Sequence, residues 1–216
     1  MNRTLCILLL AFIIYLFLKR GGGAVGLNEN VSTVHRGEGG ILFSVPNNPE
    51  PSRDSQYMLV ISGMYKSNPT WMLNEIPRWL RDTRYIAISP YTNTVETALY
   101  TANKMSVQHK GYEMGLTSIT GFSSGGSRVM TWYNPPLHRT SRMMLLDPAI
   151  SEGQSRKDYD GSVIFLYGSP LHARPYGDEY ARITEDILTD GGIVEKLDIS
   201  HYAYPRYAFN KFGNLL

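Results

Sequence analysis

The sequence predicts an α/β fold in which a mostly parallel central sheet is covered by helices on both faces. The first observation is a series of short apolar runs rich in β-branched residues, which is typical of strands buried on both sides. The second is that segments with helical spacing of their apolar residues separate most of these runs. The third is size and composition, because 216 residues with 43% hydrophobic residues can bury the core that such a sheet needs.

The apolar runs define the expected strands, and turn-forming residues end several of them. The run at residues 40–45, for example, is followed by the turn-rich sequence PNNPEPSRDS. The expected strands are residues 40–45, 57–62, 84–89, 116–122, 141–147, 162–168 and 192–199.

The intervening segments and the last part of the chain have the pattern of helices. Thr94 is a candidate N-cap for one of them, because a threonine hydroxyl can accept a hydrogen bond from the first helical turn. Pro77 must begin or kink another, because proline lacks the N–H that continues a helix. The expected helices are residues 71–82, 94–110, 123–133, 177–190 and 202–212.

The N-terminal segment is continuously apolar over residues 4–18, apart from Thr4, and Lys19 and Arg20 follow it. As a helix this run is slightly short for a hydrocarbon core of ~30 Å, and its basic flanks can reach the interface. We interpret it as an uncleaved single-pass membrane anchor, with basic residues on both sides that leave its orientation open. The alternative is a signal peptide whose cleavage releases a secreted protein. The expected organisation is residues 1–20 as anchor, residues 21–37 as linker and residues 38–216 as the globular domain.

Composition excludes several classes of function. The formal net charge is +2, and no arginine-rich stripe or zinc-ligand spacing is present, so we expect no nucleic-acid partner. The single cysteine, Cys6, lies in the apolar N-terminal segment, so no disulfide can form within the chain. The domain must therefore be stable through packing alone.

The residues that follow the strands are the candidates for a functional site. In an open parallel sheet, ligands bind at the carboxyl ends of the strands, where the connecting loops meet. The residues at these positions are Gly63, Met64, Ser123, Asp147, His172 and His201.

The sequence Gly-Phe-Ser-Ser-Gly at residues 121–125 matches the motif G-x-S-x-G between an expected strand and an expected helix. The motif needs both glycines, because the central serine lies on a tight turn where neighbouring side chains would clash. Its frame makes Ser123 the nucleophile, whereas Ser127 lies in the helix. The backbone N–H of Ser124 would point at an oxyanion from the helix N-terminus. The alternative is a glycine-rich helix cap without a catalytic role.

A serine nucleophile needs an adjacent base that is held by an acid. His201 is the preferred base because it follows the last strand, and His172 is the rival because it follows the strand before. Asp147 is the preferred acid because it directly ends a strand. Asp178 is the alternative acid, but it lies where a helix begins, a position that favours acidic residues in any case.

The order Ser123, Asp147, His201 resembles that of the α/β-hydrolase superfamily, over about residues 38–216. GFSSGG resembles the elbow of its esterases and lipases, and LLDPA resembles the GLDPA of the pancreatic-lipase family, where the acid also follows the strand after the elbow strand. In many other members the acid follows the next strand, where this chain has no aspartate at the usual early position. The resemblance further implies an oxyanion donor in the loop after an early strand. Relatives commonly carry His-Gly there, but this chain has Ser-Gly at residues 62–63, and Met64 would donate its backbone N–H.

The expected function is that of a membrane-anchored serine hydrolase that cleaves a carboxylic ester through an acyl-enzyme, without metal or organic cofactor. An acyltransferase or thioesterase would use the same residues. The alternative is a catalytically inactive domain of this fold that serves in binding or assembly of a membrane complex. Residues 148–161 leave no room for a lid, so we expect an open site for a small or lipid-linked ester. Tyrosines near His201 either line a pocket or pack the terminal helix, namely Tyr202, Tyr204 and Tyr207.

Overall fold

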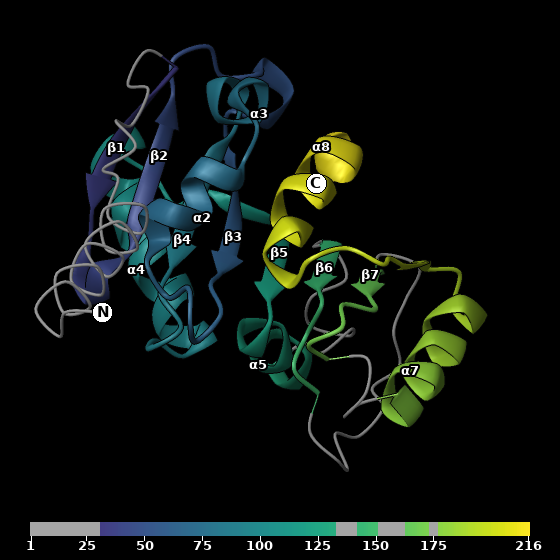
Figure 1. Cartoon of the computed structure of the whole chain (residues 1–216). Coiled ribbons are helices and arrows are strands. Elements are labelled where there is room, and N and C mark those ends of the chain that lie inside the picture. Colours follow the sequence, from purple (N-terminus) through teal and green to yellow (C-terminus); the bar gives the residue numbers. More distant parts are fainter. Residues whose placement is uncertain (1–30, 133–141, 151–162, 173–176) are drawn as a thin grey trace, which may run out of the picture.

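The computed structural model describes residues 31–132, 142–150, 163–172 and 177–216. They form one eight-stranded sheet with the strand order β1-β2-β4-β3-β5-β6-β7-β8, shown in Figure 1. The strands are β1 Ser32–Arg36, β2 Leu42–Pro46, β3 Gln56–Ile61, β4 Tyr85–Ser89, β5 Gly115–Phe122, β6 Arg142–Leu146, β7 Val163–Tyr167 and β8 Ile193–Lys196. The helices are α2 Pro69–Glu75, α3 Arg78–Thr83, α4 Val95–Lys110, α5 Ser124–Trp132, α7 Gly177–Thr189 and α8 Tyr204–Phe212, with short 3-10 turns at Glu38–Gly40, Pro51–Arg53, His201–Ala203 and Gly213–Leu215.

The sheet is mostly parallel, as the sequence predicts. Strands β4, β3, β5, β6, β7 and β8 run in one direction, whereas β2 is antiparallel to both β1 and β4. The expected strands are all present, with bounds that differ by a few residues. Strand β1 was missed, because its residues 32–36 fall in the segment expected to be a linker. It is an edge strand whose STVHR sequence is only partly buried, so it lacks the apolar run that marks the other strands.

Helices cover both faces of the sheet, and each face has its own hydrophobic core. Figure 1 shows α2, α3 and α8 on one side of the strands and α4, α5 and α7 on the other. Alternate residues of β3 serve the two sides: Leu59 and Ile61 pack with α4, α5 and α7, whereas Met58 and Val60 pack with α2, α3 and α8. This division explains why β3 reads as a continuous apolar run rather than an alternating one.

Local signals decide where the helices begin. The helix expected over residues 71–82 is divided in two, because Pro77 occupies the N-cap position of α3 and α2 ends before it. The Thr94 side chain accepts a hydrogen bond from the Thr97 N–H at 3.2 Å, which confirms its role as the N-cap of α4. Helix α4 ends at Gly111, which has a left-handed backbone with φ of 79°.

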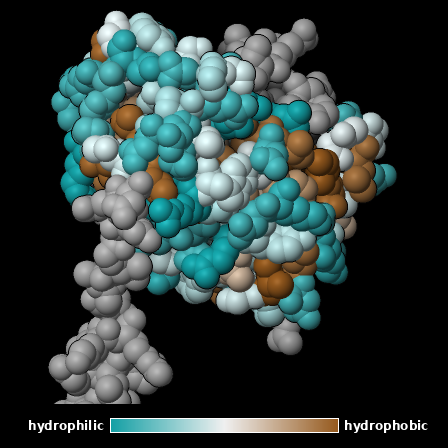
Figure 2. Space-filling model, turned by 90° about the horizontal axis from the view of Figure 1, so that it is seen from above, coloured by the Kyte–Doolittle hydropathy of each residue, from teal (hydrophilic) through white to brown (hydrophobic). Residues whose placement is uncertain are grey.

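No helix in the described part of the chain is long and apolar enough to cross a membrane. The expected anchor at residues 4–18 lies outside the described residues, as does Cys6, so the anchor stays a prediction. Figure 2 looks from the top of Figure 1 onto the end where the parallel strands begin, and hydrophilic residues cover most of that described surface, with smaller hydrophobic groups between them. The candidate site lies at the opposite end, where the strands finish.

Candidate active site

Ser123 occupies a tight turn between β5 and α5. Its backbone φ is 54°, a left-handed value that is rare for residues other than glycine. The turn is fixed from several sides, because Ser123 N–H donates to Leu146 O at 2.9 Å and Ser123 O accepts from the N–H groups of Gly126 and Ala149. The structure therefore places Ser123 at the strand-to-helix turn that the G-x-S-x-G motif predicts.

The glycines of this turn are required by close approaches of the backbone. A Cβ atom at Gly121 would lie 2.6 Å from the Cα of Gly126, and one at Gly125 would lie 2.6 Å from Ile61 O. A Cβ at Gly63, in the loop after β3, would lie 2.8 Å from the Cβ of Ser123. Helix α5 therefore packs against β5 and β3, and the loop after β3 runs directly beside Ser123.

Asp147 follows β6 and also has a left-handed backbone, with φ of 42°. Its side chain is fully buried, so its carboxylate depends on hydrogen bonds from the protein. Oδ1 accepts from the N–H groups of Gly168 and Ser169 at 3.2 and 3.3 Å, and Oδ2 accepts from the Ser169 hydroxyl. The turn after β7 therefore holds Asp147 in one orientation.

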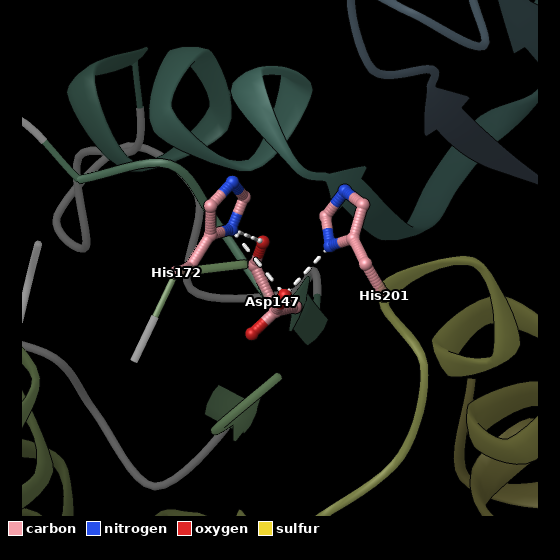
Figure 3. A group of neighbouring side chains, drawn as sticks. All are labelled: Asp147, His172 and His201. Atoms are coloured by element: carbon pink, nitrogen blue, oxygen red, sulfur yellow. Dashed lines mark hydrogen bonds and ion pairs between the residues drawn. The ribbon is translucent and has the colours of Figure 1, made fainter. Parts of the chain in front are cut away.

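Two histidines contact Asp147, and Figure 3 shows both. His201 Nδ1 lies 2.6 Å from Asp147 Oδ2. His172 Nδ1 lies 3.0 Å from the main-chain oxygen of Asp147 and 3.3 Å from Oδ2. In Figure 3 the second nitrogen of each ring points away from Asp147. The shorter contact with the carboxylate favours His201 as the histidine that Asp147 orients.

The hydrogen bonds to Asp147 stabilise its charged form. Burial alone would raise the pKa of Asp147, but hydrogen bonds from His172, His201 and Ser169 outweigh burial and hold that pKa well below its usual range. Asp147 is therefore a carboxylate at any neutral or mildly acidic pH, as a group that orients a histidine must be.

His201 lies beside the elbow. Its ring stacks on Phe122, the residue before Ser123, with ring centroids 4.6 Å apart and an angle of 26°. Among the described residues, no hydrogen bond joins Ser123 Oγ to His201 or to His172. Catalytic hydrogen bonds are often long or poorly aligned in the absence of substrate, so the missing hydrogen bond does not exclude His201 as a base for Ser123.

The two expected oxyanion donors also meet. Ser124 is the first residue of α5, where backbone N–H groups have no partner within the helix. The Met64 N–H, however, donates to the side-chain oxygen of Ser124 at 2.8 Å. The structure thus brings Met64 and Ser124 together through a side-chain contact that sequence reasoning did not foresee.

The remaining candidates lie elsewhere or have other partners. Asp178 is exposed in the first turn of α7, and the carboxylate that meets the histidines is that of Asp147. Tyr204 is fully buried, and its hydroxyl donates to Leu197 O, so it packs the terminal helix. Tyr202 and Tyr207 line a cavity of ≈ 540 Å³ between α2 and α8, and Tyr202 also lies against His201.

Sequence reasoning missed Ser169, which binds Asp147 through both its amide and its hydroxyl. Its place directly after β7, at the same sheet edge as the other candidates, was the signal that could have identified it. The stacking of Phe122 on His201 was also missed, and no pattern in the sequence indicates it.

Asp147, His172 and His201 also form the group of described residues that could hold a metal ion, with one ligand atom from each within 4.8 Å of the others. The 2.6 Å contact joins two of these atoms directly. We therefore interpret the group as an acid that hydrogen-bonds two histidines.

Comparison with known proteins identifies the fold. No family model and no curated protein matches the chain. An esterase from the bacterial hormone-sensitive lipase family superposes with a TM-score of 0.55 at 14% identity, covering 89% of this chain and 86% of that one. The esterase domain of a Rhodothermus marinus protein superposes with a TM-score of 0.52 at 12% identity, covering 85% of this chain and 96% of that one. A predicted CIB-like hydrolase from Thermoplasma acidophilum superposes with a TM-score of 0.51 at 14% identity, covering 85% of this chain and 97% of that one.

These structures and the strand order agree with the resemblance seen in the sequence. This protein therefore has the α/β-hydrolase fold. At identities of 12–14% such likeness establishes the fold and leaves the chemistry to be argued from the site itself.

Proposed function

We propose that this protein is a serine hydrolase that cleaves a carboxylic ester, with Ser123 as nucleophile, His201 as base and Asp147 as acid. The observation that carries this proposal is the 2.6 Å contact between His201 Nδ1 and Asp147 Oδ2 beside the strained turn at Ser123. A buried, charged carboxylate held by Ser169 fixes one nitrogen of His201 as the protonated one and leaves the other free to act as a base.

The reaction would proceed in two steps. His201 Nε2 takes the proton of Ser123 Oγ while that oxygen attacks the ester carbonyl carbon, and the carbonyl oxygen becomes an oxyanion. Collapse of this intermediate breaks the bond to the alcohol oxygen, which takes the proton from His201, and Ser123 remains acylated. Water then repeats the sequence on the acyl-enzyme and releases the acid. Asp147 stabilises the charged imidazole in each step.

The surroundings of the site support an ester with an apolar part. Exposed apolar side chains occupy the loops after β3, β7 and β8, namely Met64, Tyr65, Leu171 and Tyr202. Lys66 Nζ lies 5.7 and 5.3 Å from the ring centroids of Trp71 and Tyr202, so its ammonium group lies beside these apolar side chains. The apolar segment at residues 4–18 supports a membrane-anchored form of the enzyme, near lipid-linked esters.

The experiment is covalent labelling of the folded, full-length protein with a fluorophosphonate probe, followed by mass spectrometry of the modified peptide. We expect labelling at Ser123 and its loss in Ser123→Ala. Ser127→Ala is the matched control, because Ser127 lies in the same helix and bonds the main-chain oxygen of Ala149, so this variant should still be labelled.

Two results would contradict the proposal: absence of labelling in folded wild-type protein, or labelling that persists in Ser123→Ala. The first would favour the alternative of a non-catalytic domain that serves in binding or assembly. If the wild type is labelled, product analysis with added alcohol acceptors would separate hydrolysis from acyl transfer, and thioester substrates would test for thioesterase activity.

A further inference from the structure

The hydroxyl of Ser124 contacts the loop that was expected to supply an oxyanion donor. Its oxygen accepts the Met64 N–H at 2.8 Å, so the backbone donor of the loop after β3 already has a partner. The same loop runs against the nucleophile, since a Cβ atom on Gly63 would lie 2.8 Å from the Cβ of Ser123. The Ser124 hydroxyl is therefore held between this loop and the elbow.

A serine hydroxyl can accept hydrogen bonds and donate one at the same time. Since Ser124 Oγ accepts from Met64, its own proton is available, and no acceptor for that proton is observed among the described residues. The Ser124 N–H belongs to the first residue of α5, and the leading N–H groups of a helix have no partner within the helix. One residue thus presents two donors next to Ser123.

We propose that the Ser124 hydroxyl is a catalytic donor of the oxyanion site, together with the Ser124 backbone N–H. The Met64 N–H then acts through the hydroxyl: it polarises the O–H bond, and the hydroxyl donates to the negatively charged oxygen of the tetrahedral intermediate. No proton is transferred to the oxyanion in this arrangement. The inference rests on the proposed function, and it assigns to a side chain the role that the sequence resemblance gave to the Met64 amide.

This arrangement predicts a kinetic signature. A donor to the oxyanion acts mainly on the transition state, so its removal lowers kcat and leaves KM nearly unchanged. Boronic acids form a tetrahedral adduct with an active serine and place an oxygen at the oxyanion position. Boronic acids should therefore bind more weakly to a variant without the Ser124 hydroxyl, by about the same factor as kcat falls, because the adduct resembles the transition state.

The experiment compares the wild type with Ser124→Ala and Ser124→Thr, using steady-state hydrolysis of p-nitrophenyl butyrate and inhibition by phenylboronic acid. We expect Ser124→Ala to lower kcat roughly 10²-fold to 10³-fold, the usual effect of removing one oxyanion donor. The affinity for phenylboronic acid should fall by a similar factor. Ser124→Thr retains a hydroxyl and should recover most of the loss. Thr131→Ala, which removes an exposed hydroxyl from the same helix, should match the wild type.

The outcomes separate this inference from the proposed function. If the wild type hydrolyses the ester and Ser124→Ala equals or exceeds it, the hydroxyl is idle or blocks the site, and this inference alone is overturned. If Ser124→Thr remains as slow as Ser124→Ala, while both melt at the wild-type temperature, the loss does not come from the missing hydroxyl, which also overturns it. If the wild type neither hydrolyses esters nor reacts with fluorophosphonate, both proposals fall.

Discussion

At the scale of single residues, Asp147 connects the loops that follow β6, β7 and β8. It accepts hydrogen bonds from Ser169 and contacts His172 and His201, while its own backbone adopts a left-handed conformation. Strained residues of this kind persist only where their surroundings hold them firmly, and they cluster at functional sites. The positive φ at both Ser123 and Asp147 indicates that the surrounding structure holds the two residues firmly, as the proposed roles of nucleophile and acid require.

The contacts of the two histidines predict different consequences of their loss. His201→Gln should lower kcat roughly 10²-fold to 10⁴-fold, the usual contribution of a general base. His172→Gln should have a much smaller effect, because the nearest partner of His172 Nδ1 is the main-chain oxygen of Asp147. The rates of ester hydrolysis and of fluorophosphonate labelling measure both effects. A reversed order, with His172→Gln the slower variant, would identify His172 as the base.

At the scale of elements, the packing of α5 on β5 positions Ser123. Helix α5 begins directly after Ser123, so any shift of the helix against the sheet moves Ser123 relative to the loops that carry Asp147 and His201. Glycines at the contact allow backbone to approach backbone, with no side chain that could yield.

Gly121→Ala should therefore destabilise the protein. The added Cβ would lie 2.6 Å from Gly126 Cα and 2.7 Å from Gly125 O, which are backbone atoms. Overpacking of this kind usually costs about 1–3 kcal/mol. Urea or thermal denaturation measures the change, and Gly177→Ala is the control, because a Cβ there meets nothing within 4 Å. Equal stability of the two variants would show that α5 can move away from β5 without cost.

At the scale of the whole molecule, the two hydrophobic cores are joined through a sheet whose carboxyl edge contains a buried charge. The loops that converge on Asp147 follow strands β6, β7 and β8, which are neighbours in the sheet. Protonation of this one carboxylate would weaken contacts among all three loops, so the pH dependence of global stability reports on the site.

The lowered pKa of Asp147 gives this dependence a definite sign. Because that pKa lies below the usual 3.8 in the folded protein, the unfolded chain binds more protons in acid. The contribution of Asp147 is therefore complete above pH ~4 and is lost as the pH falls through the folded-state pKa.

Asp147→Asn tests this expectation. The stability difference between the wild type and Asp147→Asn should be large at neutral pH and should shrink as the pH falls below ~4. The unfolded wild-type chain then takes up a proton at Asp147, whereas the folded protein, with its lower pKa, does not until the pH falls further. Chemical denaturation at a series of pH values measures it. Asp178→Asn, which changes an exposed acid, should keep the pH dependence of the wild type. A constant difference across this range would contradict the assigned role of the Asp147 charge.

The sequence by itself determined where the strands of the parallel sheet lie along the chain and where the turn at Ser123 lies. Apolar runs such as residues 57–62 are continuous because the strands are buried on both faces. Glycines occur around Ser123 because the backbone contacts there leave no space for a side chain. Both are local consequences of packing, so they leave a pattern along the chain. Strand β1 left no such pattern, because an edge strand is held mainly by backbone hydrogen bonds to β2.

Only the tertiary structure decided which groups meet. The sequence left Asp147 and Asp178 as competing acids and His201 and His172 as competing bases, and it gave no sign that Ser124 binds the Met64 amide. These contacts join residues from different loops, over distances of 2.6 to 3.3 Å between atoms. A hydrogen bond requires such distances, and they follow from the twist of the sheet and the course of each loop, which spacing along the chain does not record.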